Sequence, residues 1–380
     1  MSTRLAIIWN HFGPYHMARI RALHPHFEVS SIELASDQRL YRWWRGELDS
    51  SSHTLTSGDW EDQNKLLVAI KLWRKLTLLQ PAIILVPGYA SLAAISAALW
   101  GCANGAATIV MSESNIDDRQ RSYWSETLKA LIVRLLFSGG IAGGKRSIQY
   151  LERLGLPAHH IASGYDVVDN QYFASCAQEC RNEPNNWDSM KLSPYFLYVG
   201  RLAPEKNIFT LLDAFRQYRN SGGIWPLVIV GDGPLNQSLQ AHAHLLDLSE
   251  SVHFVGRKSV QELPSFYAFA GCFVLPSVSE PWGLVVNEAM ATGLPVIASS
   301  RCGCADDLVE DGANGFIINP CEVASLAEAL RRISNLSVGA LAQMGERSQA
   351  IIARYSLERW ASELVRISSM IGKDRLGNAS

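Results

Sequence analysis

The chain has almost no excess charge of either sign. It contains 34 lysines and arginines against 36 aspartates and glutamates, which gives a formal net charge of −2 at pH 7. Proteins that bind the phosphate groups of nucleic acids usually carry a marked excess of basic residues. We therefore expect no nucleic-acid partner.

Paired cysteines at metal-binding spacings are also lacking. The seven cysteines are odd in number and scattered along the chain. The closest pairs, Cys302 with Cys304 and Cys176 with Cys180, have no second pair of the kind that a structural zinc site requires. We interpret them as reduced thiols of a cytoplasmic protein, and we expect neither a bound metal nor another cofactor.

Long hydrophobic runs are interrupted. The N-terminal run is too short for a signal peptide because residues 10–14 (NHFGP) break it. Residues 82–103 carry no charge over about the length of a bilayer, but Pro87-Gly88 divides them. This division favours a buried strand followed by a helix over a membrane span.

The length of the chain and a repeating pattern of apolar runs indicate its domain number and its fold. At 380 residues the chain is too long for one core of ordinary size, so we expect two domains. Short apolar runs alternate with helical patterns, which predicts βαβ units and therefore an α/β fold with parallel sheets. The runs lie at residues 5–9, 82–86, 107–111, 195–200, 226–231, 252–256, 272–277 and 295–299.

A polar, proline-bearing stretch at residues 178–194 divides these runs into two groups and has the composition of a linker. We predict an N-terminal domain over residues 1–177 and a second domain over residues 195–355, each a doubly wound parallel sheet. The tail, residues 356–380, is predicted to contain an amphipathic helix that Ser356 caps.

Charged residues follow the strand ends of the second domain. Arg201 and Lys206 follow one run, Arg257 follows another, and Glu280 follows a third. Two such domains form a cleft, and ligands of open parallel sheets lie beyond the carboxyl ends of the strands. These side chains are therefore candidates for a binding site.

The segment EPWGLVVNEAMATGLPVIAS (residues 280–299) predicts a helix that starts at Gly283. The N–H groups of Gly283 and Leu284 at such a helix start, together with the helix dipole, favour an anion such as phosphate. Glycine allows the anion to approach the backbone closely.

Two cations and two carboxylates complete this interpretation. Arg201 and Lys206 offer the positive charge that a diphosphate needs. Glu288, inside the helix, suits the hydroxyls of a ribose, and Glu280, before it, suits those of a second sugar. This order of groups predicts a nucleotide diphosphate sugar as ligand.

The motifs GRLAPEKN, VGDGP, VHFVG and EPWGLVVNEAMATGLPVIAS, in this order, closely resemble the second domain of the retaining glycosyltransferase family 4. The resemblance covers about residues 195–320, and YSLERW near residue 355 is similar to the start of that family's terminal crossing helix. It implies the GT-B fold, in which two Rossmann-like domains face each other across a cleft.

The resemblance also implies roles for individual residues. Three are implied to act in catalysis by holding the diphosphate and the donor sugar: Arg201, Lys206 and Glu280. The implied donor-binding residues are Glu288, Gly283, Leu284, Trp282, Val255, Gly256, Arg257 and, in the first domain, Gly13.

The first domain matches the family less closely. The sequence MSESN (residues 111–115) stands where family members often carry a histidine, so the acceptor-side candidates are His11, His16, Glu113 and Ser114. A histidine on a helix is more often a packing residue than a catalytic one. Before the linker, Asp169 and Phe173 are expected to anchor the structure.

The resemblance implies transfer of a sugar from a UDP or GDP sugar to an acceptor hydroxyl, with retention of configuration, in glycan, exopolysaccharide or glycolipid synthesis. The acceptor is a glycan, a lipid-linked molecule or a small molecule. We expect a metal-independent reaction, because the sequence has no Asp-x-Asp triplet and positive side chains with a helix start can stabilise the leaving diphosphate.

Alternatives remain open. A sugar nucleotide 2-epimerase and a non-catalytic nucleotide-binding module have the same architecture. The stretch RLYRWWRGE (residues 39–47), with Trp43 and Trp44, is either a solvated loop with buried tryptophans or a patch that contacts the inner membrane face, and LWRKL (residues 72–76) adds to the second interpretation. The nucleotide, the acceptor and the oligomeric state are left open.

Overall fold

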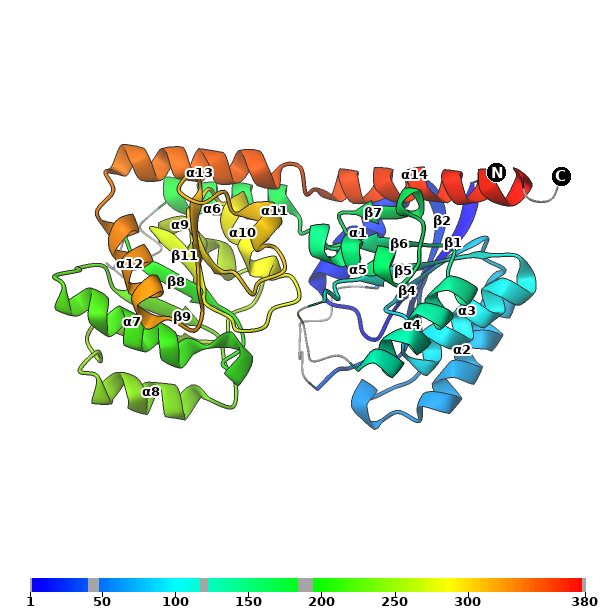
Figure 1. Ribbon diagram of the computed structural model, residues 1–380, viewed down its shortest axis with the longest axis horizontal. Coiled ribbons are helices and arrows are strands. Elements are labelled where there is room, and N and C mark those ends of the chain that lie inside the picture. Colours follow the sequence, from blue (N-terminus) through cyan, green and yellow to red (C-terminus); the bar gives the residue numbers. More distant parts are fainter. Residues whose placement is uncertain (1, 40–47, 117–121, 184–193, 378–380) are drawn as a thin grey trace. The chain divides into compact units, whose positions relative to one another are not determined.

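The computed structural model describes residues 2–39, 48–116, 122–183 and 194–377. The chain forms two compact units (Figure 1). The first comprises Met1–Val168 together with Ser356–Ser380, and the second comprises Asp169–Tyr355. Trp43 and Trp44 lie outside the described residues, so both interpretations of this stretch stay open.

The first unit is built on a seven-stranded sheet of order β3-β2-β1-β4-β5-β6-β7, in which all pairs are parallel. The strands are β1 (Thr3–Trp9), β2 (Phe27–Glu33), β3 (Ser52–Thr54), β4 (Ile83–Pro87), β5 (Ala107–Ser112), β6 (Gly139–Ala142) and β7 (Ile161–Ser163). The chain thus runs outward from β1 to one edge and then from β4 to the other. Right-handed crossovers place the helices of these two halves on opposite faces of the sheet.

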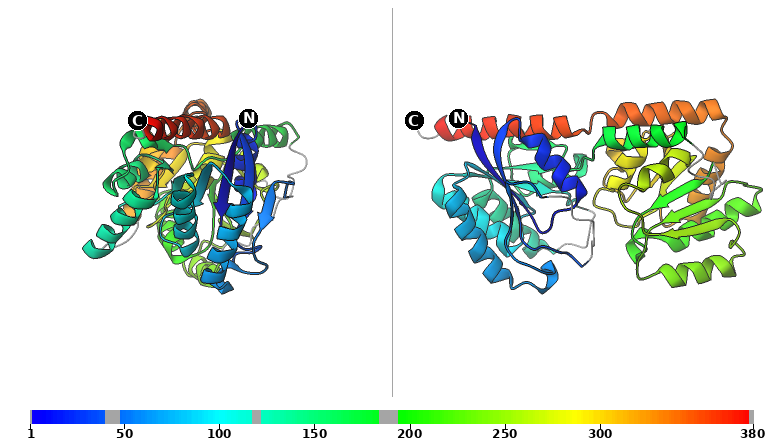
Figure 2. Two further views of the ribbon diagram at one scale, coloured as in Figure 1. Left: turned by 90° about the vertical axis from the view of Figure 1, so that its right-hand side faces the viewer. Right: turned by 180° about the vertical axis from the view of Figure 1, so that it is seen from behind.

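Helices cover both faces. On one, α1 (Pro14–Leu23) packs against α14 (Leu357–Gly377), as the rear view of Figure 2 shows. On the other, four helices share a hydrophobic core with Ala6 and Ile8 of β1. They are α2 (Lys65–Leu79), α3 (Leu92–Asn104), α4 (Tyr123–Leu136) and α5 (Lys145–Arg153). Because the sheet is covered twice, β1 is apolar almost throughout instead of alternating.

The second unit has a six-stranded parallel sheet of order β10-β9-β8-β11-β12-β13. Its strands are β8 (Phe196–Val199), β9 (Leu227–Val230), β10 (Val252–Gly256), β11 (Cys272–Leu275), β12 (Val296–Ser299) and β13 (Gly315–Ile318). Its helices are α6 (Asn170–Asn182), α7 (Ile208–Asn220), α8 (Asn236–Leu245), α9 (Leu263–Phe269), α10 (Leu284–Ala291), α11 (Ala305–Leu308), α12 (Val323–Ser334) and α13 (Val338–Ile352).

The start of the expected linker is helical. Helix α6 extends to Asn182 and packs on α9 and α10, and the Arg181 guanidinium donates to the carbonyls of Ala268 and Thr292 (2.9 Å each). The expected anchors Asp169 and Phe173 are confirmed, since Asp169 caps α6 and Phe173 is buried. The second unit therefore begins at Asp169, earlier than the sequence indicated.

The C-terminal helix belongs to the first unit. Helix α14 begins after Ser356, as predicted, and the Ser356 hydroxyl accepts from the N–H of Arg359 (3.3 Å). The indole N–H of Trp360 donates to the carbonyl of Arg19 in α1 (3.2 Å), and both side chains are buried. This bond fixes α14 on α1.

Residues 82–103 form strand β4 and helix α3, as predicted, and none of the described helices is long and apolar enough to cross a membrane. All seven cysteines are free thiols.

Two glycines allow the loops after β8 and β9 to touch. A Cβ on Gly231 would lie 1.8 Å from the Gly200 carbonyl oxygen, and one on Gly233 would lie 2.4 Å from that of Leu202. Gly231 also has a φ of +145°, which side chains disfavour. The loop that carries Arg201 can therefore lie this close to the neighbouring loop only because residues 231 and 233 have no side chain.

Substitution of Gly231 tests this packing. We expect Gly231→Ala to lower the free energy of unfolding of the second unit by about 3 kcal/mol or more, because steric overlap adds to backbone strain. Gly222→Ala is the matched control, since Gly222 has a φ of +88° with nothing near its Cβ position, and should cost only about 1 kcal/mol. Urea unfolding followed by tryptophan fluorescence measures both, and equal losses would contradict the packing argument.

Candidate donor-binding site

The candidate donor site lies at one edge of the second unit's sheet. All strands of this sheet are parallel, so the loops that follow β8, β9, β10 and β11 leave it at the same edge. Strands β8 and β11 are direct neighbours, although they are far apart in the sequence. Their loops therefore meet.

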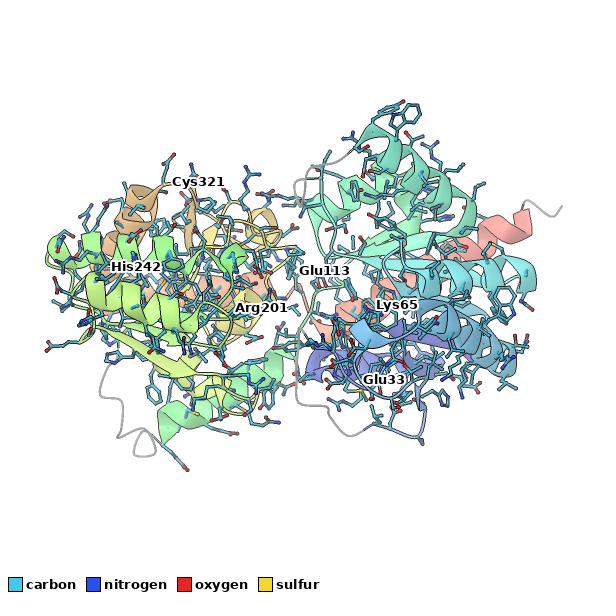
Figure 3. The ribbon with its side chains drawn as sticks, turned by 90° about the horizontal axis from the view of Figure 1, so that it is seen from below. Glu33, Lys65, Glu113, Arg201, His242 and Cys321 are labelled. Atoms are coloured by element: carbon cyan, nitrogen blue, oxygen red, sulfur yellow. The ribbon has the colours of Figure 1, made fainter. Side chains whose placement is uncertain are left out.

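The loop after β8 carries both predicted cations. Arg201 donates to Glu205 Oε1 (2.5 Å), and the Tyr198 hydroxyl donates to the carbonyl of Arg201 (3.0 Å). Partial burial would raise the pKa of Glu205, but the hydrogen bond from Arg201, a backbone hydrogen bond and the charges of Arg201 and Lys206 together lower it. Glu205 thus stays ionised and orients the guanidinium of Arg201, which Figure 3 labels.

The second cation, Lys206, forms an ion pair with Glu280. Its Nζ contacts Glu280 Oε2, and the two side chains are only 18% and 11% exposed. Asn207 fixes the turn that presents the lysine. Its amide donates to the carbonyls of Pro276 (3.1 Å) and Pro320 (2.8 Å), and its φ of +59° is tolerated by asparagine.

Backbone contacts hold Glu280 in place. The N–H of Gly303 donates to the Glu280 carbonyl (2.9 Å), and the Ser277 hydroxyl lies 3.4 Å from Glu280 Oε2. Gly303 must be a glycine, since a Cβ there would lie 1.8 Å from the Pro281 carbonyl oxygen. Glu280 is therefore a well-positioned carboxylate at the strand ends.

Helix α10 starts as predicted. Gly283 is its N-cap, with a φ of +105°, and Leu284 is its first residue. Among the described residues, none accepts a hydrogen bond from the N–H groups of Gly283 and Leu284. Such a helix start attracts anions.

Glu288 lies inside α10 and is buried. The hydroxyl of Tyr267, from α9, donates to Glu288 Oε2 (2.7 Å). The carboxylate thus has a buried hydrogen-bond partner, and its contact with a ribose stays a prediction.

Trp282 packs in the core of the second unit. It is buried, its indole N–H donates to Asn287 Oδ1 (3.0 Å), and its ring lies 6.0 Å from that of Tyr355. A donor contact by Trp282 would therefore come from its backbone. The remaining candidates lie at the end of β10, where Val255 and Gly256 are partly buried and Arg257 is exposed.

In the first unit, His11 lies at the end of β1 and is buried. Its Nδ1 is 3.5 Å from Glu33 Oε2, and Glu33 also accepts from the N–H of Phe12 (3.1 Å) and the hydroxyl of Thr54 (2.6 Å). Figure 3 marks Glu33, the last residue of β2. Sequence reasoning missed this carboxylate, because β2 (FEVSSIE) mixes polar with apolar residues and was not predicted as a strand.

His16 and Gly13 form a local contact at the start of α1. The N–H of Gly13 donates to His16 Nδ1 (2.8 Å), so in this structure Gly13 directs its N–H to His16. The imidazole stacks near Trp9, with ring centroids 4.6 Å apart. Burial, with the positive charges of Arg19 and His11, holds the pKa of His16 well below its usual value. His16 is therefore a neutral imidazole whose Nε2 carries the proton.

Glu113 and Ser114 follow β5, which ends at Ser112; Figure 3 labels Glu113. The Glu113 carbonyl accepts from Ser147 (3.0 Å), and the N–H of Ser114 donates to Ser112 Oγ (3.3 Å). Burial and the charge of Glu113 raise the pKa of Asp166 well above its usual value, although Arg19 opposes this shift.

Arg19 links these groups and was also missed. It is buried, donates to the Val167 carbonyl (3.1 and 3.2 Å), lies 3.8 Å from Asp166 and covers the Tyr165 ring at 4.7 Å. The arginine lies among the apolar residues Met17 and Ile20 of α1, which is the only local hint of its burial.

Potential metal ligands gather elsewhere. Among the described residues, one group of three side chains has ligand atoms close together: His159, His160 and Asp374 of the first unit. It shares no residue with the candidate donor site.

The comparison with protein families concerns the second unit. Residues 181–350 match the family model described as glycosyl transferases group 1. The second unit is a group 1 glycosyltransferase domain. The match agrees with the predicted glycosyltransferase resemblance of this part of the chain, and the ion pair and helix start described above lie within the matched residues.

Curated relatives match part of the chain. The alpha-D-kanosaminyltransferase of Streptomyces kanamyceticus is 28% identical over 218 residues, which cover 57% of this chain and 56% of the relative. A sulfoquinovosyl transferase of Arabidopsis thaliana is 34% identical over 159 residues, which cover 41% of this chain and 29% of the relative. The chain thus spans about half or less of the length of these relatives.

Solved structures match the whole chain. HepE of Anabaena, crystallised with UDP, matches 97% of this chain at a TM-score of 0.75 and 19% identity, and the match covers 100% of HepE. At this identity the likeness establishes the fold. The predicted fold class is confirmed: the chain has two Rossmann-like parallel-sheet units, as in GT-B glycosyltransferases, and the second of them contains the group 1 match.

The neutral state of His16 has a measurable consequence. The pKa of His16 is lower in the folded than in the unfolded protein, so its contribution to stability is complete above the unfolded pKa and is lost as the pH falls below it. That loss amounts to at most about 1.4 kcal/mol per pH unit below roughly pH 6.5. In His16→Asn, whose amide oxygen can accept from Gly13, the free energy of unfolding should fall less steeply on acidification. Equal slopes, or nitrogen NMR showing a charged His16 at neutral pH, would contradict this assignment.

Proposed function

We propose that the protein is a retaining glycosyltransferase that moves a sugar from a nucleotide diphosphate sugar to an acceptor hydroxyl. The observation that carries the proposal is the Lys206–Glu280 ion pair beside the start of α10 in the group 1 domain. It combines a cation, a carboxylate and free backbone donors at one sheet edge.

The diphosphate is assigned to the start of α10. The N–H groups of Gly283 and Leu284 and the helix dipole favour negative charge there. Lys206 and Arg201 neutralise it from the loop after β8. Because the base of the nucleotide needs a neighbouring surface, we assign it to Val255, Gly256 and Arg257 at the end of β10.

We assign the two glutamates to different hydroxyl groups of the donor, those of its sugar and those of its ribose. Glu280 is assigned to the donor sugar, since its carboxylate lies at the strand ends next to Lys206. Glu288 is assigned to the ribose, and Tyr267, which already donates to it, orients the carboxylate.

The reaction we propose proceeds through an oxocarbenium-like state. As the bond from the sugar to the diphosphate breaks, negative charge grows on the diphosphate, and Lys206 and the helix start stabilise it. The acceptor hydroxyl approaches on the face that the diphosphate leaves, and a diphosphate oxygen takes its proton. A double displacement needs a carboxylate nucleophile, and no aspartate or glutamate can be identified from the sequence for that role.

We assign the acceptor to the first unit, with His11, His16, Glu113 and Ser114 as candidates. His16 is suited to donate a hydrogen bond from Nε2, because Gly13 occupies Nδ1. The acceptor is a glycan, a lipid-linked molecule or a small molecule, and the proposed location is the cytoplasm, with peripheral contact at the inner membrane face.

The donor nucleotide can be found by a thermal-shift panel of UDP, GDP, ADP and their sugars. A ligand at a hundred times its dissociation constant stabilises the folded protein by about 2.7 kcal/mol. HepE, which has the same fold, was crystallised with UDP and with UDP-glucose, so the UDP series comes first. Product analysis with donor alone separates a transferase, which needs an acceptor, from a sugar nucleotide 2-epimerase, which does not.

Variants of the two glutamates test the donor assignment. Glu288→Gln should weaken both the nucleoside diphosphate and the sugar donor by roughly one to two powers of ten, because a charged hydrogen-bond partner contributes about 1.5 to 3 kcal/mol. Glu280→Gln should spare the free diphosphate and weaken only the sugar donor. Isothermal titration calorimetry measures both.

Tyr267→Phe is the matched control. If Glu288 serves only as a buried acceptor for Tyr267, Tyr267→Phe and Glu288→Gln will lower stability alike and neither will change nucleotide affinity. Equal losses of diphosphate affinity for the two glutamate variants would also show that they do not divide ribose from sugar.

Lys206→Ala and EDTA together test the leaving-group chemistry. We expect Lys206→Ala to lower kcat by a larger factor than it weakens donor binding, because the lysine acts on charge that develops in the transition state. EDTA should leave turnover unchanged. A reaction that EDTA abolishes and magnesium or manganese restores, with little effect of Lys206→Ala, would assign this role to a metal.

A further inference from the structure

Helix α4 of the first unit carries an apolar stripe on its exposed side. Trp124, Leu128, Leu131 and Leu135 recur at helical spacing and are between 54% and 79% exposed. Val133 is the only residue of α4 that is fully buried. The helix is thus more apolar outside than its packing on the sheet requires.

Helices α2 and α3, which pack against each other, extend this surface. On α2, Leu66, Ile70 and Trp73 are exposed, and on α3, Leu92 and Leu99. A groove of about 450 Å³ between the two helices is lined by these side chains. Figure 3 views this side of the first unit, with α2 and α3 side by side.

The exposed hydrophobic side chains are clustered on these three helices and are not spread evenly over the described surface. Twelve of the nineteen large hydrophobic side chains that are exposed in the described residues lie on α2, α3 and α4. Isolated exposed apolar residues need no explanation, whereas a contiguous group marks an interaction surface.

Cations flank the patch. Lys71, Arg74 and Lys75 of α2 line a second hollow of about 430 Å³, together with His53 and Leu78. Among the described residues, no carboxylate lies within 4.0 Å of these three cationic side chains. Lys71 also donates to the carbonyl of Leu55 (3.3 Å), whereas Arg74 is exposed.

Acidic residues are nearly missing from these helices. Glu126 of α4 is the single one in α2, α3 and α4. Its carboxylate accepts from Lys129 and from the Tyr150 hydroxyl, 2.7 Å each, so its charge is compensated on the inner side. The outer surface combines leucines, tryptophans and uncompensated cations.

We propose that the outer surface of α2, α3 and α4 docks on a lipid bilayer that contains anionic headgroups. Leucine side chains enter the acyl boundary, tryptophans lie at the headgroup level, and lysine and arginine pair with anionic lipids. The scarcity of acidic side chains, with Glu126 already paired, favours this occupant over a second copy of the chain, because like cations would face each other there. The inference shares no residue with the candidate donor site.

Flotation of the full chain with vesicles tests the proposal. The protein should bind vesicles that contain phosphatidylglycerol, bind pure phosphatidylcholine far less, and lose binding as salt is raised. The variant Lys71→Gln/Arg74→Gln/Lys75→Gln should reduce partitioning on the order of 100-fold, since each basic residue near an anionic surface contributes roughly a factor of five. Trp124→Ser/Leu128→Ser/Leu131→Ser should also reduce it.

The matched control is Leu245→Ser/Val338→Ser, which replaces apolar residues of the second unit that are 79% and 86% exposed. This variant should bind vesicles like the wild type. Equal binding by all variants would overturn the proposal. So would a wild-type dimer in light scattering that the α4 variant converts to a monomer without any vesicle binding. Nucleotide affinity, measured on the same variants, should be unchanged, so failure of the docking surface is distinguishable from failure of the proposed transferase.

Discussion

The pairing of β8 with β11 is the constraint on which the second unit's site depends. These strands are separated by β9 and β10 in the sequence but are neighbours in the sheet, and both run in the same direction. Their following loops therefore emerge side by side, and Lys206 meets Glu280. The contacts of Asn207 with Pro276 and Pro320 brace the same junction. Topology, and not local sequence, brings the two charges together.

Much of the second unit could be predicted from the sequence, and the reason is physical. Strands buried on both faces are continuous apolar runs, so segments such as Leu227–Val230 and Cys272–Leu275 stand out. Five strands were missed. Four of them, β2, β3, β6 and the three-residue β7, lack this signal, whereas β13 is a short apolar run after Gly315 that was overlooked. β2 contains polar residues, β3 is a three-residue edge strand of polar residues, and β6 begins with two glycines. The helical start of the expected linker was missed because α6 shows mostly polar residues to solvent.

The residues of the candidate sites also differ in how far the sequence predicts them. The residues of the second unit occur in compact motifs, so their proximity could be inferred before the structure was known. In the first unit, Glu33, Arg19 and Asp166 come from three different elements, and no spacing in the sequence relates them. The burial of Trp282 and the hydrogen bond from Tyr267 to Glu288 were equally invisible, because they depend on packing between elements.

The bond between Trp360 and Arg19 has a consequence for the order of assembly on the ribosome. The second unit is one continuous segment, whereas the first is built from segments that precede and follow the second in the sequence. Domains fold as units during synthesis, generally from the N-terminus onward. Here residues 1–168 cannot complete their packing when they are made, because α14, which covers the face beside α1, is translated only after the second unit. The unit of residues 169–355 can therefore reach its native state first, and α14 then completes the first unit.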